Sequence, residues 1–398
     1  MKNRFSNKLL ASSTLSAILL LSGCGSSSSS SDTASSLSST GQLVDNYVEN
    51  VDYICANGQK GITDINGTFE CTTFPVEFKL AGLKLGQINS MPSDNQIFPQ
   101  DLIGVTRSDT NNSDVIAMAR FLQSCDDDND SKNGIRIKNE IKEQFTLAVE
   151  FNSNDIDAYA SDANITLIDE SSSIEHLEET TQLVESIDAI EKIPSALKDA
   201  LLTPANTLTQ ETKNTLAYMG NEERLAYDIY NSLYAAHLAS GTEIKQLTNI
   251  ATKSEATHIQ TVQVLVQKYI TDVSDFTNVT LDNLDYIDAN IVDMPTGIYN
   301  IIDIQNLYNT LIAKGIQSKQ DALEVGCMVE VVDINDLLDD IQLATDSNAS
   351  DVVAAFEFLR DGSYRHYWSF DKGLKNMGVS DGCCVLGADY CHPEYPQN

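Results

Sequence analysis

Residues 254–269 read SEATHIQTVQVLVQKY, and this stretch decides the fold. Apolar residues recur at three- and four-residue spacing between Leu247 and Tyr269, which is typical of a helix with one buried face. Glu255 and His258 interrupt that face. Burying an ionisable side chain without a partner is unfavourable. The segment therefore predicts a packed helix in which a partner neutralises Glu255 and His258.

Three other long segments follow the same design. Each has an apolar stripe at helical spacing that includes polar or ionisable residues. The stripes are Leu216, Met219, Glu223, Ala226, Tyr230 and Leu233; Leu323, Gly326, Glu330, Asp333, Leu337 and Ile341; and Val352, Ala355, Leu359, Ser363, His366 and Phe370. Four such helices predict a bundle over residues 211–378. A shorter helix is expected over residues 306–314, followed by a capping box at Ser318 and Asp321.

The ionisable residues on these stripes indicate a metal site. Glu255 and His258 are three residues apart, so they project from one helix face. A second helix repeats this spacing, and the other two contribute one residue each. Buried carboxylates repel one another unless a cation lies between them. The sequence predicts one or two metal ions held by Glu223, Glu255, His258, Glu330, Asp333 and His366.

One ligand position has an alternative. Glu222 directly precedes Glu223 and shares a stripe with Leu225 and Ile229. We prefer Glu223, because it lies on the stripe of Leu216 and Tyr230.

This arrangement resembles the ferritin-like di-iron carboxylate proteins, and more closely an uncharacterised bacterial and archaeal ferritin-like family. The matching segments are NEERLAYD (221–228), SEATH (254–258), ALEVG (322–326), Glu330 with Asp333-Ile334, and RDGSYRH (360–366). Together they cover about residues 211–370. The fuller di-iron pattern would have Glu at Ser363 and His at Asp333, so this chain departs from it at two positions.

The resemblance implies one or two iron ions, or another divalent metal, and ferroxidase or oxygen- or peroxide-linked redox activity. One interpretation of the function is therefore a di-iron oxidoreductase. The alternative is a non-enzymatic envelope protein that uses the metal for structure or sequestration. No four-cysteine cluster of the rubredoxin type is visible as an electron donor.

The N-terminus is similar to a bacterial lipoprotein signal. Lys2, Arg4 and Lys8 precede the apolar residues 9–21, and LSGC (21–24) ends the run. Residues 1–23 would be removed, and Cys24 would carry the lipid that anchors the chain to a membrane. Gly25 after the cysteine favours the outer membrane of a Gram-negative cell. Residues 24–40 are rich in serine and indicate a flexible tether in the cell envelope.

Residues 41–182 are expected to form a small β-rich domain that also contains helices. Residues 53–55, 61–64, 67–69 and 76–80 have strand-like composition and are separated by turn residues. The segments GQLVD (41–45), GITD (61–64) and NGTF (66–69) resemble the N-terminal domain of many bacterial surface lipoproteins, a family that implies no activity. An acidic connector over residues 183–210 follows, with a helix expected over residues 174–193. The predicted fold class is multidomain α+β.

A loop in this first domain has the donors that calcium prefers. Asp126, Asp128 and Asp130 alternate between helices expected over residues 115–123 and 137–145. An EF-hand-like loop would have Gly at Ser131 and Glu at Ile137, so the bidentate ligand is missing unless Glu140 supplies it. A solvated acidic turn is the alternative.

The predicted export would bring the cysteines into an oxidising compartment, where disulfides are the expected state. Cys55 and Cys71 flank a turn-rich segment and are expected to form one. Cys327 is expected to be a small buried hydrophobic residue. Cys383, Cys384 and Cys391 lie in a tail over residues 379–398, where zinc binding with His392 is an alternative. Seven cysteines remain beside Cys24, so at least one thiol stays free or pairs with another molecule.

The overall charge narrows the class of partner. The chain has 25 Lys and Arg against 58 Asp and Glu, a net charge of −33 over 398 residues. Such a field repels phosphate backbones, which argues against nucleic acid. Metal cations are the favoured small partners.

Overall fold

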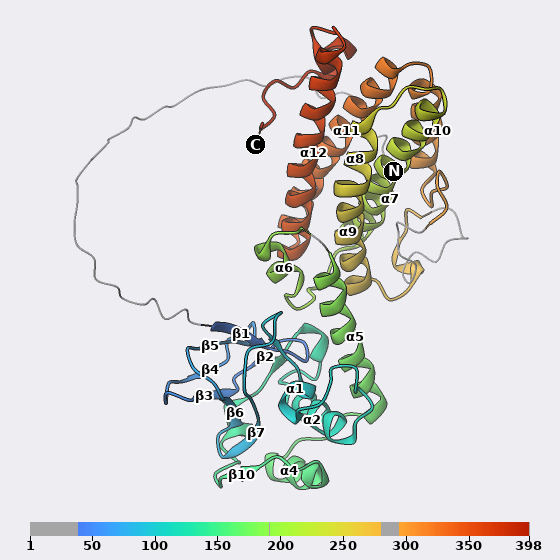
Figure 1. Cartoon of the computed structure of the whole chain (residues 1–398). Helices are drawn as coiled ribbons and strands as arrows, with labels where there is room; N and C mark the ends of the chain where they lie inside the picture. The colour runs from blue at the N-terminus through green and yellow to red at the C-terminus, as the bar shows by residue number, and fades with distance from the viewer. Residues whose placement is uncertain (1–38, 191, 280–293, 398) are drawn as a thin grey trace, which may run out of the picture. The chain divides into compact units, whose positions relative to one another are not determined.

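The computed structural model describes residues 39–190, 192–279 and 294–397. The expected signal peptide, Cys24 and the tether up to residue 38 lie outside the described residues. Strands dominate the first part of the described chain and helices the second (Figure 1). This order agrees with the expected mixed fold. None of the helices in the described part of the chain has the length and apolar character that crossing a bilayer requires.

The first part is built on short strands in three groups. The largest sheet has the order β10 (Val149–Glu150), β7 (Leu83–Ile88), β6 (Val76–Leu80), β3 (Asp52–Cys55) and β4 (Lys60–Ile62). A second sheet has the order β5 (Thr68–Cys71), β1 (Ser39–Leu43) and β8 (Gln96–Ile97), and β2 (Val48–Glu49) pairs with β9 (Ile135–Arg136).

Alternation along the strands explains how they bury one face. In β6, Val76, Phe78 and Leu80 are fully buried while the two residues between them are partly exposed. A disulfide joins Cys55 on β3 to Cys71 on β5, so it links the two larger sheets.

Helices follow and alternate with the later strands along the chain. They are α1 (Pro99–Ile103), α2 (Ser113–Ser124), α3 (Asn139–Lys142), α4 (Ile156–Ala163) and α5 (Glu170–Ala189), with single turns η1 (Ser131–Asn133) and η2 (Ser153–Asp155). The prediction of a helix over residues 137–145 is wrong, because α3 has only four residues. Ile137 instead forms a β-bridge with Asp126, and the extended backbone of Lys138 keeps the helix from starting earlier.

The second part consists of long helices. They are α6 (Ser195–Leu201), α7 (Gln210–Ala239), α8 (Lys245–Ile250), α9 (Ala256–Tyr269), α10 (Ile302–Gly315), α11 (Lys319–Asp346) and α12 (Ser350–Asn376), with a π-helical turn η3 (Ala251–Glu255) between α8 and α9 and a single turn η4 (Val273–Asp275) after α9. Packing contacts run from α7 to α9, from α9 to α12, from α12 to α11 and from α11 back to α7 (Figure 1). Ser318 caps α11, since its Oγ accepts a hydrogen bond from the Asp321 N–H at 3.0 Å.

Two apolar clusters fill the interior of this helical region. Along α7 the chain passes from one cluster, which contains Met219, to the other, which contains Leu225. Along α12, Leu359 belongs to the first of these clusters and Tyr367 to the second. Glu223 on α7 and residues 363 and 366 on α12 fall at these transitions, so a polar layer separates the two clusters.

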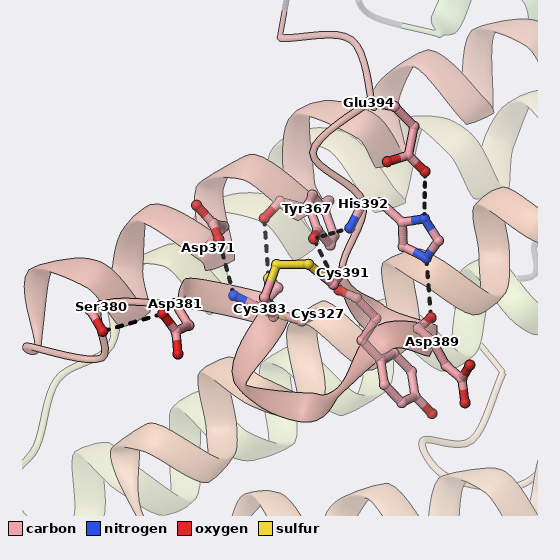
Figure 2. Close-up of a disulfide and its surroundings, with 12 residues drawn as sticks. Cys327, Tyr367, Asp371, Ser380, Asp381, Cys383, Asp389, Cys391, His392 and Glu394 are labelled. Carbon is pink, nitrogen blue, oxygen red and sulfur yellow. Dashed lines mark hydrogen bonds and ion pairs between the residues drawn. A yellow bond between two sulfur atoms is a disulfide. The ribbon is translucent and has the colours of Figure 1, made fainter.

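One disulfide fastens the C-terminal tail to α11, and a second one closes a loop within the tail. Cys327 on α11 bonds to Cys383 in the turn η6 (Gly382–Leu386), and Cys384 bonds to Cys391 after η7 (Ala388–Tyr390) (Figure 2). The Asp371 carboxylate accepts the N–H of Cys383 at 3.0 Å, which fixes the turn to α12.

These bonds correct two expectations. Cys327 is buried, but it is a disulfide partner and not merely a small hydrophobic residue. Zinc binding by the tail is wrong, because all three of its cysteines are joined in disulfides. Among the described cysteines, Cys125 is free, and it is buried.

Candidate metal centre

Each of the four long helical segments contributes side chains to one buried layer. Glu223 lies on α7, Glu255 ends the π-turn, His258 follows on α9, Glu330 and Asp333 lie on α11, and His366 lies on α12. Their exposed fractions range from 1% to 6%. The structure therefore brings all six predicted ligands into the interior.

The first group of donor atoms is formed by Glu223, Glu255 and His258. Nδ1 of His258 lies 3.0 Å from Oε2 of Glu223 and 3.1 Å from Oε2 of Glu255. One ligand atom from each residue fits within 4.8 Å of the others. This spacing suits a single metal ion.

The second group is formed by Glu255, Glu330 and His366. Nδ1 of His366 lies 3.0 Å from Oε1 of Glu255 and 3.3 Å from Oε2 of Glu330. These three residues also offer ligand atoms within 4.8 Å of one another. Glu255 is thus shared, with one oxygen facing each histidine. The arrangement can hold two ions bridged by one carboxylate.

Several of these atoms have no hydrogen bond. They are Oε1 of Glu223, Oε1 of Glu255, Oδ1 of Asp333 and Nδ1 of His366. His366 Nδ1 and Glu255 Oε1 lie 3.0 Å apart without forming a hydrogen bond. Buried polar atoms in native proteins usually have partners, and a bound cation would supply one here. Carboxylate oxygens and imidazole nitrogens are a donor set that iron, manganese and zinc accept.

Asp333 lies beside both groups without belonging to either tight cluster. Oγ of Ser363 on α12 donates a hydrogen bond to Oδ2 of Asp333 at 2.6 Å. The other oxygen, Oδ1, stays buried without a hydrogen bond. Burial, followed by the charge of Glu223, raises the pKa of Asp333 well above its ordinary value.

Local backbone features lie at Glu255 and beside His258. The π-helical turn ends at Glu255, whose side chain is buried. Gly362 on α12 faces His258, and a Cβ at this position would lie 2.4 Å from Nε2. The rings of His258 and His366 stack with their centroids 5.6 Å apart. Only glycine leaves room for the observed imidazole.

Burial and charge together shift the pKa values of the ligands. Burial raises the pKa of Glu223 to about 7, although His258 opposes this. Burial would lower the pKa of His258, but the carboxylates of Glu223 and Glu255 raise it to about 10. The same competition raises the pKa of His366 well above its ordinary value. In the metal-free chain, protons on the histidines therefore take the place that a cation would occupy.

Tyr230 on α7 adds a contact to the second group. It is fully buried and its hydroxyl donates a hydrogen bond to Oε1 of Glu330. Burial, followed by the charge of Glu330, raises the pKa of Tyr230 well above its ordinary value. The tyrosine thus stays protonated and fixes the orientation of this carboxylate.

Comparisons with known proteins cover this helical region. Residues 212–386 match a family described as "Uncharacterized protein domain (DUF2202)". The chain is 33% identical to "Uncharacterized protein MJ0754" of Methanocaldococcus jannaschii over 175 residues, which are 44% of this chain and 81% of the relative. The chain belongs to the DUF2202 family. A crystal structure of hypothetical protein MJ0754 from Methanococcus jannaschii is 29% identical, with a TM-score of 0.36 over 44% of this chain and 86% of that one.

The DUF2202 region contains every residue of the candidate centre. It extends from α7 into the first disulfide-bonded turn of the tail, and it ends before Cys391. The strand-rich part of the chain lies outside it. All six side chains therefore come from the residues that match the family.

The aspartate loop of the strand-rich part has a different geometry. Oδ1 of Asp126 accepts the N–H of Arg136 and Oδ2 accepts that of Asp130, both at 2.9 Å. Asp128 accepts from the Asp130 N–H and from Asn133. The close group of oxygens is formed by Asp126, Asp127 and Asp128, and Asp130 is not part of it. Hydrogen bonds thus already occupy the carboxylates of Asp126 and Asp128, two of the three that were expected to bind calcium.

Sequence reasoning missed three features around the centre. Ser363 holds Asp333, Tyr230 holds Glu330, and Gly362 makes space for His258. Ser363 and Tyr230 lie on the inner stripes, which was a signal that they face the site. The need for glycine at 362 depends on contact with another helix and leaves no local signature.

Proposed function

We propose that the DUF2202 region is a ferritin-like metal centre that binds two iron ions and oxidises ferrous iron with dioxygen or peroxide. The observation that carries the proposal is Glu255, whose two oxygens each face a different histidine at 3.0–3.1 Å. Each histidine also has a second carboxylate neighbour, so the set divides into two similar subsites.

Charge balance supports two divalent ions. Four buried carboxylates, those of Glu223, Glu255, Glu330 and Asp333, surround the two histidines. Two divalent cations would offset four negative charges and leave both imidazoles neutral. A buried charge cluster without such compensation would be strongly destabilising.

The ligand set also supports redox chemistry. Each subsite has one imidazole and at least two carboxylates, which leaves coordination positions for an oxygen-containing acceptor. Ferrous ions bound here would supply the electrons. The shared carboxylate of Glu255 can shift its bonding as charge changes, while Tyr230 and Ser363 hold Glu330 and Asp333 in place.

The test is metal analysis followed by an anaerobic ferrous-oxidation assay, repeated with dioxygen or peroxide added. Glu255→Ala and His258→Ala should lose metal and lose oxidant-dependent turnover. Glu243→Ala is the control, because Glu243 is exposed and its nearby cation is Lys245 at 3.6 Å. Equal metal content in all three variants would contradict the assignment of Glu255 and His258 as metal ligands.

A structural or sequestering role for the metal is the second candidate. It is favoured by the burial of all six ligands between two apolar clusters, which limits access for a substrate. Bound iron without any oxidant-dependent turnover would support this role over the first.

We further propose that the protein is a lipoprotein of the cell envelope, anchored through Cys24. The signal-like residues 1–24 support this, and their placement lies outside the described structure. Mass spectrometry of the N-terminal peptide should detect acylated Cys24, and Cys24→Ala should move the protein out of the membrane fraction. An unacylated mature N-terminus would contradict the anchor.

A further inference from the structure

A cavity borders helix α5 outside the metal centre. Its volume is about 750 Å³, which lies in the range of pockets that hold small organic molecules. It is lined by residues of α5, of the turn between β1 and β2, and of the chain around the C-terminal ends of α6 and α9. The lining includes none of the six candidate metal ligands. The cavity is therefore a second place where this chain can hold a ligand.

One side chain of the lining, His176 on α5, has a buried atom without a partner. The residue is 6% exposed, and its Nε2 lies 3.1 Å from the backbone oxygen of Asp45. A carbonyl oxygen only accepts, so Nε2 carries the hydrogen, and Nδ1 of the neutral imidazole has the lone pair. Nδ1 has no hydrogen bond within the chain, although buried polar atoms usually have one. A ligand in the cavity can supply the donor that Nδ1 lacks.

Another part of the lining is apolar. Leu183, Leu202 and Ala205 line the cavity and pack against the apolar cluster that contains Ile270. Val184 also lines it and follows His176 by eight residues, which is about 12 Å along the axis of α5. An apolar body the size of two fused rings therefore has a surface to pack against while a polar group reaches His176.

The cationic side chains of the lining already have partners. Nζ of Lys132 lies 3.1 Å from a carboxylate oxygen of Glu179, and Lys268 pairs with Asp351 at 2.6 Å. Glu175 adds an exposed carboxylate to the lining. No excess of positive charge thus draws an anion into this cavity, which favours an uncharged ligand.

We propose that the cavity binds an uncharged hydroxyl compound with an apolar body, of the class of fused-ring phenols. The hydroxyl donates a hydrogen bond to Nδ1 of His176, and the rings pack against Leu183, Val184 and the apolar residues beside them. This assignment does not depend on the metal centre or on its proposed function.

The experiment is a fluorescence titration of the full chain with three probes that share one ring system. 2-Naphthol has the hydroxyl donor, 2-methoxynaphthalene has the same oxygen without a hydrogen, and 2-naphthoate has a negative charge. 2-Naphthol should bind, and the other two should bind roughly tenfold more weakly or less, because they leave Nδ1 without a donor.

Two variants locate the bound probe. His176→Phe keeps a ring and removes Nδ1, so the affinity for 2-naphthol should fall roughly tenfold, to that for 2-methoxynaphthalene. His237→Phe is the matched control, because His237 is also 6% exposed with Nε2 2.8 Å from a backbone oxygen, that of Gly315, but lies outside the cavity. Ala205→Trp fills the apolar part and should weaken both probes, and it serves if His176→Phe does not fold.

Four results would overturn the proposal. The first is a wild type that does not bind 2-naphthol. The second is equal affinity of the wild type for 2-naphthol and 2-methoxynaphthalene, since His176 would then accept no hydrogen bond from the ligand. The third is tighter binding of 2-naphthoate, which would contradict an uncharged ligand. The fourth is 2-naphthol affinity that survives Ala205→Trp unchanged, because the probe would then be bound elsewhere.

Discussion

Ser363 and Asp333 are joined across two helices by a hydrogen bond of 2.6 Å from the serine hydroxyl to Oδ2 of the aspartate. The serine stands where a di-iron pattern would have a glutamate. The carboxylate that would come from α12 is thus supplied by α11, and the short side chain on α12 makes room for it. Relative to that pattern, a carboxylate stands on α11 instead of α12, and the histidine of α11 has no replacement.

Ser363→Ala should test whether this hydrogen bond stabilises Asp333. It removes the donor to Oδ2 and leaves a buried carboxylate with one partner fewer, which costs about 1–3 kcal/mol of unfolding free energy in the metal-free chain. Urea denaturation with and without metal measures the effect. Ser380→Ala, on an exposed turn, is the control. An unchanged midpoint for Ser363→Ala without metal would show that the hydroxyl does not stabilise Asp333.

Gly362→Ala should displace a ligand without changing any ionisable residue. The new methyl group would lie 2.4 Å from Nε2 of His258, so the imidazole must move. Metal affinity should fall roughly tenfold or more, as for other changes around ligands. Gly373→Ala is matched to it on α12, since its Cβ meets the flexible end of Gln246. Equal metal affinity of both variants would contradict the contact.

Stability of the metal-free chain should fall as pH rises. The pKa of Glu223 is raised from 4.5 to about 7, and that of His258 from 6.5 to about 10. Both groups bind more protons in the folded state, so their contribution is fully present below the unfolded pKa and is lost as pH rises through the folded one. The fall should span pH 4.5 to about 7 for Glu223 and 6.5 to about 10 for His258.

Metal should reverse this trend, because an ion needs deprotonated ligands and binds better as pH rises. Denaturation of chelated and metal-loaded protein across this range measures both slopes. A chelated protein that gains stability between neutral and alkaline pH would contradict the protonated His258. His258→Gln should flatten the upper part of the curve.

The sequence could predict the layer but not its detailed geometry. Periodicity shows which residues of a helix share a face, so the sequence alone places Glu255 and His258 side by side. It does not show how neighbouring helices are rotated, and this rotation decides that Ser363 meets Asp333. The prediction of a helix over residues 137–145 was wrong for a related reason. The backbone of Ile137 pairs with Asp126 in a bridge, and no local pattern reveals a pairing partner eleven residues away.

The two tail disulfides should differ in what they contribute to stability. The Cys327–Cys383 bond closes a loop of 56 residues, and the Cys384–Cys391 bond closes one of only 7. Loop-closure entropy predicts losses of about 4 and about 2 kcal/mol when each pair is replaced by serine. The first loss is larger because more freedom is restored to the unfolded chain.

Urea denaturation of Cys327→Ser/Cys383→Ser and Cys384→Ser/Cys391→Ser measures both losses, with Cys55→Ser/Cys71→Ser as a control outside the helical region. If the tail only covers the helices, metal content should survive in both tail variants. Equal losses in the two would show that tail packing around Tyr367, and not loop closure, dominates.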